Sequence, residues 1–98
     1  MDRVKAHLHE TYGESIRRVI LYGSYARGEA TKDSDVDVLV LTDPSLKPFE
    51  VRKSLSGLLF DMLMDESELV SVIVIPEDYF DQHNLPFMMN VRKEGVAI

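Results

Sequence analysis

Two short groups of residues in the first half of the chain have the types and spacing needed to handle a phosphorylated substrate. Gly23-Ser24 ends an apolar run, and Asp35-Val36-Asp37 follows after ten further residues. A glycine allows a tight turn with the backbone pressed against a ligand. Free backbone N–H groups and a hydroxyl at the start of a helical turn attract phosphate oxygens. We therefore expect Gly23 and Ser24 to form a phosphate-binding turn.

The two aspartates of the second group are spaced for a metal ion. Residues two apart on a strand project from the same face, so Asp35 and Asp37 are expected to lie side by side. Two adjacent carboxylates repel and raise each other's pKa, and a divalent cation removes that conflict. Mg²⁺ favours one or two carboxylates together with waters and substrate phosphates. Either group alone is typical of a solvated turn or strand end, but together they predict phosphoryl or nucleotidyl transfer.

The elements around these residues are expected to alternate between helices and strands. Apolar runs in 15–22, 35–41 and 69–75 predict three strands, each covered on both faces because the runs do not alternate with polar residues. Helical periodicity, caps and prolines predict helices over 2–12, 48–64, 77–82 and 86–94, a helical turn over 25–27, and a last extended piece over 96–98. The order αβαβαβα favours an α/β (α+β) fold, a small mixed β-sheet with helices packed on it, as one domain over 1–98.

Composition excludes several classes of function. The 98 residues carry 11 Lys and Arg against 17 Asp and Glu, for a net charge of -6, so a nucleic-acid partner is not expected. The absence of cysteine excludes disulfides, zinc–thiolate sites and thiol catalysis. No apolar run approaches the roughly 18 residues of a membrane span. Residues 1–10 are charged and lack an apolar signal core, which favours a soluble cytoplasmic protein.

The segments GSYARG (23–28) and SDVDVLV (34–40) resemble the minimal nucleotidyltransferases of the DNA polymerase beta superfamily. The chain length, the amphipathic helix after the second strand and the ending Glu94-Gly95-Val96 also suit this family. The resemblance implies a nucleotidyltransferase fold with ATP as substrate. It also implies that some members are antitoxins, which attach AMP to a tyrosine of a small helical HEPN-type toxin. In such a site Gly23 and Ser24 would hold the triphosphate, Asp35 and Asp37 would bind Mg²⁺, and Arg27 and Lys32 would lie near the phosphates.

One position departs from the family pattern. Active superfamily members carry a third carboxylate on the next strand, commonly as the general base, and the expected register places Ser71 there. A serine hydroxyl is neither an acid nor a base at neutral pH, and the nearest acids, Glu66 and Glu68, precede the strand. Two hypotheses follow. The chain is a Mg²⁺-dependent enzyme that transfers AMP to a hydroxyl of a partner protein, or it is an impaired nucleotide-binding or docking module that neutralises a HEPN-type partner without chemistry.

Other residues with chemical potential are expected to be structural. All three histidines are predicted to be surface residues, and Tyr25 is either a base-stacking or a rim-packing residue. The acids at 77, 78 and 81 are attributed to compensation of a helix dipole. The apolar excess of the helix over 86–94 indicates either core closure or an interface patch, the latter allowing a homodimer. The histidines are His7, His9 and His83, and the apolar residues are Phe87, Met88, Met89 and Val91.

Overall fold

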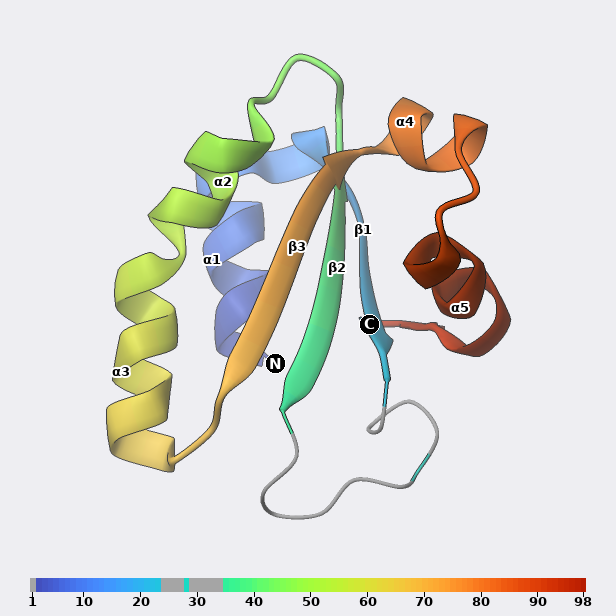
Figure 1. The fold of residues 1–98 in the computed structure, drawn as a ribbon. Helices are drawn as coiled ribbons and strands as arrows, with labels where there is room; N and C mark the ends of the chain where they lie inside the picture. Colours follow the sequence, from blue (N-terminus) through green and yellow to red (C-terminus); the bar gives the residue numbers. More distant parts are fainter. Residues whose placement is uncertain (1, 24–27, 29–34) are drawn as a thin grey trace.

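The computed structural model describes residues 2–23, 28 and 35–98 and has a mixed sheet with helices on both faces (Figure 1). The strands lie in the order β3-β2-β1-β4. They are β1 (Ile16–Tyr22), β2 (Val36–Thr42), β3 (Val70–Pro76) and β4 (Val96–Ala97). The helices are α1 (Asp2–Tyr12), α2 (Pro48–Ser54), α3 (Ser56–Glu66), α4 (Glu77–Gln82) and α5 (Pro86–Glu94), with a 3₁₀ turn, η1 (Gly13–Ser15), before β1. The predicted elements are therefore confirmed in type and order, except that the helix expected over 48–64 is divided in two. The turn expected over 25–27 lies outside the described residues.

The sheet is mixed because its neighbours run in different directions. β2 pairs antiparallel with β1 and parallel with β3, while β4 pairs antiparallel with β1. The backbone N–H of Ile98 also donates to the carbonyl of Val19, at 2.9 Å, which extends the short contact of β4. This arrangement confirms the expected mixed sheet. It places the end of β1 beside the start of β2, where the two groups of candidate residues lie.

Two apolar clusters hold the helices on opposite faces of the sheet. On one face the even-numbered residues of β2 and β3 pack against α1, α2 and α3. On the other face Leu39 and Leu41 pack with Ile20 and with α4 and α5. Every residue of β2 after Asp37 is buried, so the expectation that this strand runs into the interior is confirmed. In the part of the chain that is described, no helix is long and apolar enough to cross a membrane.

The prediction of a single helix over 48–64 is wrong, because the structure has two helices there, α2 and α3. The hydroxyl of Ser54 donates to the carbonyl of Val51, at 2.7 Å, and competes with the helical backbone bond. The N–H of Leu55 then bonds three residues back, to Arg52, in a tighter turn. Serine and glycine around this point, including Gly57, favour such a break. The buried stripe nevertheless continues across it, through Val51, Leu55, Leu59 and Met62.

β3 was expected to be covered on both faces, and this is also wrong. Val70, Val72 and Val74 are buried against the helices, whereas Ser71 and Ile73 are exposed on the other face. β3 lies at the edge of the sheet. The apolar cluster beneath α4 and α5 contains Ile20, Leu39 and Leu41, and from β3 it is joined by Ile75, near the end of the strand. The open face of β3 therefore borders Asp37, its neighbour in the sheet.

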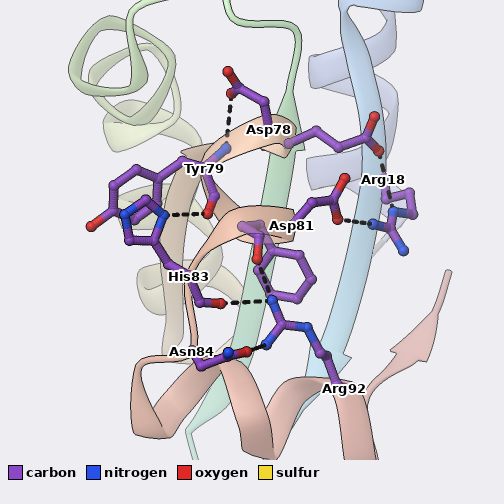
Figure 2. A network of polar contacts seen from close by, with 9 residues as sticks. Arg18, Asp78, Tyr79, Asp81, His83, Asn84 and Arg92 are labelled. Carbon is purple, nitrogen blue, oxygen red and sulfur yellow. Dashed lines mark hydrogen bonds and ion pairs between the residues drawn. The ribbon is translucent and has the colours of Figure 1, made fainter.

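Polar contacts fix α4 to β1 and to α5 (Figure 2). Arg18 of β1 lies 3.4 Å from Glu77 and 3.7 Å from Asp81, so two of the three acids attributed to dipole compensation also form ion pairs. Arg92 of α5 donates to the carbonyls of Phe80 and His83 and to the side chain of Asn84. These bonds occupy carbonyls that the end of α4 leaves unpaired.

The three histidines differ in their surroundings. His9 and His83 are exposed, as expected, and the ring of His83 stacks on Tyr79 at 3.8 Å. His7 is half-buried, and its Nε2 lies 3.3 Å from the hydroxyl of Ser54. The prediction for His7 was therefore wrong, because α1 packs against the α2–α3 segment along this side.

Candidate functional site

Gly23 and Asp37 meet where β1 ends and β2 begins. Tyr22, the last residue of β1, pairs with Asp37 across the antiparallel ladder, and Gly23 follows directly. Gly23 has a φ of +75°, in the left-handed region that other residues adopt at a cost. A Cβ at this position would overlap the Oδ2 of Asp37. Glycine is therefore favoured here, and its backbone lies close to the Asp37 carboxylate. The predicted contact of this turn with a phosphate stays a prediction.

Asp35 lies immediately before the first residue of β2 and is exposed. The next residue is anchored, because the N–H of Val36 donates to the carbonyl of Leu69 at 2.9 Å and its side chain is buried. The alternation of an extended chain directs residues 35 and 37 to the same side. The exposed Asp35 and the half-buried Asp37 thus lie at the start of β2, which is an interior strand of the sheet. This is the position predicted for the two acids.

Tyr22 is a site residue that the sequence analysis did not identify. Burial raises the pKa of its phenol, and the negative charge of Asp37 raises it further. The phenol therefore stays protonated at neutral pH beside the carboxylate. The only signal in the sequence is its place as the last residue of the strand before Gly23, and that place also suits an ordinary packing residue.

Ser71 occupies the third position of a row across the sheet. The ladders pair Tyr22 with Asp37 and Asp37 with Ser71, so Ser71 lies next to Asp37 as the expected register requires. Its side chain is exposed. Glu66 ends α3 and forms an ion pair with Arg3 at 2.8 Å, and Glu68 precedes β3. Neither acid belongs to the strand, so Ser71 is the side chain that β3 presents beside Asp37.

The described part of the site fits a magnesium ion bound together with a substrate. Three of the six predicted residues are described, namely Gly23, Asp35 and Asp37, while Ser24, Arg27 and Lys32 lie outside the described residues, as does Tyr25. Within 2–23, 28 and 35–98 no group of three or more metal-ligating side chains occurs. Two carboxylates beside a left-handed glycine match an ion that takes its other ligands from water and phosphate. A separate cavity of about 240 Å³, between Arg18, Phe80 and Arg92, contains none of these residues.

Comparisons with known proteins show the family to which the chain belongs. The family model described as nucleotidyltransferase domain matches residues 1–94. The protein MJ0604 of Methanocaldococcus jannaschii, named as a candidate protein adenylyltransferase, is 33% identical over 89 residues, covering 90% of this chain and 83% of its own. Protein adenylyltransferase MntA of Thermococcus cleftensis is 44% identical over 69 residues, which span 64% of this chain and 68% of MntA.

Solved structures share the fold at low sequence identity. A toxin–antitoxin structure with AMP-PNP matches with a TM-score of 0.60 and 19% identity, over 98% of this chain and 70% of that one. A mutant of the toxin–antitoxin pair MntA–HpeT matches with a TM-score of 0.62 and 17% identity, over 98% of this chain and 69% of that one. These likenesses establish the fold that positions the site.

Proposed function

The chain belongs to the nucleotidyltransferase domain family, and from that premise we propose that it binds ATP with Mg²⁺ and transfers AMP to a hydroxyl group of a partner protein. The observation that carries this proposal is the nearness of Gly23 to Asp37, which places a left-handed glycine beside a carboxylate. The names of the relatives support protein as the acceptor.

Each residue of the site would have a separate task in this reaction. Asp35 and Asp37 would hold the ion, which neutralises charge on the triphosphate. Gly23 and Ser24 would bind the β- and γ-phosphates, and Arg27 and Lys32 would lie near them. The acceptor oxygen would then attack the α-phosphorus in line, forming a new P–O bond as pyrophosphate leaves. Tyr22, neutral and beside Asp37, would line the site without adding charge.

We propose that the partner is a small helical HEPN-type protein. The toxin–antitoxin setting of the structural neighbours supports an assembly of this kind. The acceptor would approach the open face of β3, where Ser71 and Ile73 are exposed next to Asp37.

Labelled ATP tests the transfer. The protein is incubated with Mg²⁺, ATP labelled at the α-phosphate, and the protein encoded beside it. Label should appear on that protein with the wild type and disappear with Asp35→Asn and Asp37→Asn combined. Asp78→Asn serves as the matched control, because Asp78 is exposed on α4 and its contact with the N–H of Tyr79 can be kept by an amide oxygen. Label transfer that persists in the double variant contradicts the assignment.

The second candidate function is neutralisation of the same partner by docking, without chemistry. The observation that favours it is Ser71 in register with Asp37, since a serine cannot accept the proton of the attacking hydroxyl. This candidate predicts that ATP binds but no label is transferred, and that the double variant still controls the partner. It also predicts that Ser71→Asp, which restores a carboxylate, makes label transfer detectable at about 10²-fold or more above the background of the reaction without enzyme, the scale of general base catalysis.

A further inference from the structure

Exposed apolar side chains recur along α2 and α3, two of the helices that cover one face of the sheet (Figure 1). Phe49 is 76% exposed, and Phe60 and Met64 are each 61% exposed. Leu63 is 36% exposed on the same helix as the last two. Large apolar side chains that gather on one exposed surface mark an interaction site more often than scattered ones do. We define the outer stripe by its exposed members Phe49, Lys53, Ser56, Gly57, Phe60, Leu63 and Met64.

The spacing of these residues makes the outer stripe a helix-packing surface. Its members recur at three- and four-residue intervals, which is the spacing of neighbours on one helix face. They lie opposite the buried stripe of Val51, Leu55, Leu59 and Met62, so the core does not use them. The two small members, Ser56 and Gly57, lie in the middle, with the large apolar members toward both ends. A second helix can approach closely at such small residues.

Charge divides the α2–α3 segment into two unlike halves. Residues 47–54 contain three basic residues and one acid, whereas residues 56–66 contain three acids and no base. Glu66 is already paired with Arg3, and among the described residues Asp61 and Asp65 form no ion pair. Lys47 and Lys53 are exposed at the other end. The α2–α3 segment therefore carries a basic half and an acidic half, and these two halves are electrostatically complementary.

We propose that the outer stripe is the contact surface between two copies of this chain, packed antiparallel and crossing at Ser56 and Gly57. In that arrangement Phe49 of one copy faces Met64 of the other. Lys53 faces Phe60, with Asp61 adjacent to receive the ammonium group. The basic half of each segment thus meets the acidic half of its partner, whereas a parallel arrangement would bring like charges together.

The symmetry of the surface selects a second copy over an unrelated partner. A twofold interface uses the same patch on both subunits, so the patch must complement itself when reversed. The outer stripe does so in shape, because its small residues lie at the centre. The α2–α3 segment that carries it does so in charge, because residues 47–54 are mainly basic and residues 56–66 are acidic. This dimer uses none of the residues proposed for ATP and Mg²⁺, so its test is independent of the proposed function.

Sedimentation velocity measures the predicted mass. Even the weakest interfaces of standard size have dissociation constants of about 1 µM. At about 100 µM the wild type should therefore sediment at twice the monomer mass of 11.2 kDa. Phe60→Asp should sediment as a monomer while its circular dichroism stays unchanged, because Phe60 is exposed. Met89→Asp, an equally apolar exposed position on α5, is the matched control and should remain dimeric. A monomeric wild type or a dimeric Phe60→Asp overturns the proposal.

Two further variants test the antiparallel geometry. Lys53→Asp and Asp61→Lys should each weaken the dimer, and the two combined should restore it. Because the chain has no cysteine, Ser56→Cys introduces a single thiol next to the twofold axis. Oxidation should then link the two copies, since a disulfide requires Cα atoms within roughly 4.4–6.8 Å. Asp78→Cys on α4 is the control and should stay unlinked. The packing is contradicted if the dimer forms but Ser56→Cys does not link its two copies. It is also contradicted if the outer stripe binds a different protein and not a second copy of this chain.

Discussion

Gly23 shows how closely a single residue type is fixed by its surroundings. Its φ of +75° and the nearness of the Asp37 carboxylate disfavour any residue with a Cβ. Gly23→Ala should lower the free energy of unfolding by about 1–2 kcal/mol for the left-handed backbone alone. It should also abolish ATP binding, because the new Cβ displaces Asp37. Chemical denaturation and ATP titration measure the two effects.

Gly13→Ala is the matched control for that variant. Gly13 has a similar φ of +57°, but a Cβ there would meet nothing within 4 Å. It should lose a comparable amount of stability and keep full affinity for ATP. If both variants bind ATP equally well, the contact between Gly23 and Asp37 has no part in the site.

Asp43 gives the fold a dependence on pH at a single residue. The backbone N–H and hydroxyl of Ser45 and the guanidinium of Arg17 lower the pKa of Asp43 from 3.8 to about 2. Because the folded pKa is depressed, its stabilising effect is present above pH 3.8 and is lost as pH falls toward 2.

The difference in unfolding free energy between the wild type and Asp43→Asn should therefore shrink between pH 5 and pH 2. Urea denaturation at several pH values measures it. A difference that stays constant across this range shows that the carboxylate is not held in the charged form.

At the scale of elements, Arg92 joins α5 to the end of α4. Its guanidinium donates to two backbone carbonyls and to Asn84, and lies 4.5 Å from the centre of the Phe80 ring. Arg92→Ala should lower the free energy of unfolding by about 1–3 kcal/mol, because charged hydrogen bonds to carbonyls are lost. Lys93→Ala, an exposed position on the same turn, should change it little. Equal losses in the two variants would show that the carbonyl contacts contribute nothing.

The elements also show where sequence patterns were sufficient. Runs such as Val19 to Tyr22 and Val38 to Leu41 are rich in strand formers, and helical spacing and prolines marked the helices, so most element bounds lie within one or two residues of the prediction. Two features were missed because they depend on tertiary contacts. The hydroxyl of Ser54 breaks the helix at Leu55, and the position of β3 at the sheet edge leaves Ser71 and Ile73 uncovered.

For the site, the sequence predicted that the turn at Gly23 lies near Asp35 and Asp37, but the direct approach of Gly23 to Asp37 follows from the antiparallel pairing of β1 with β2. The family resemblance, together with the expected register of the strands, placed Ser71 beside Asp37. Spacing could not reveal Tyr22, whose pKa is raised by burial and by the charge of Asp37. It could not reveal the outer stripe either, because the exposure of Phe49 and Phe60 follows only from how α2 and α3 are placed on the sheet.

At the scale of the whole molecule, the mixed sheet places Asp35, Asp37, Gly23 and the exposed face of β3 near one end of its strands. The net charge of -6 makes a phosphate-rich ligand unfavourable there unless a cation accompanies it. The central claim is therefore that ATP binding depends on both Mg²⁺ and the two aspartates.

Calorimetric titration of ATP into the protein, with and without Mg²⁺, tests that claim most directly. The wild type should bind ATP only when Mg²⁺ is present, and Asp35→Asn combined with Asp37→Asn should weaken binding by about tenfold or more, equivalent to at least about 1.4 kcal/mol. Wild-type affinity that is the same without Mg²⁺, or unchanged in the double variant, would contradict the account.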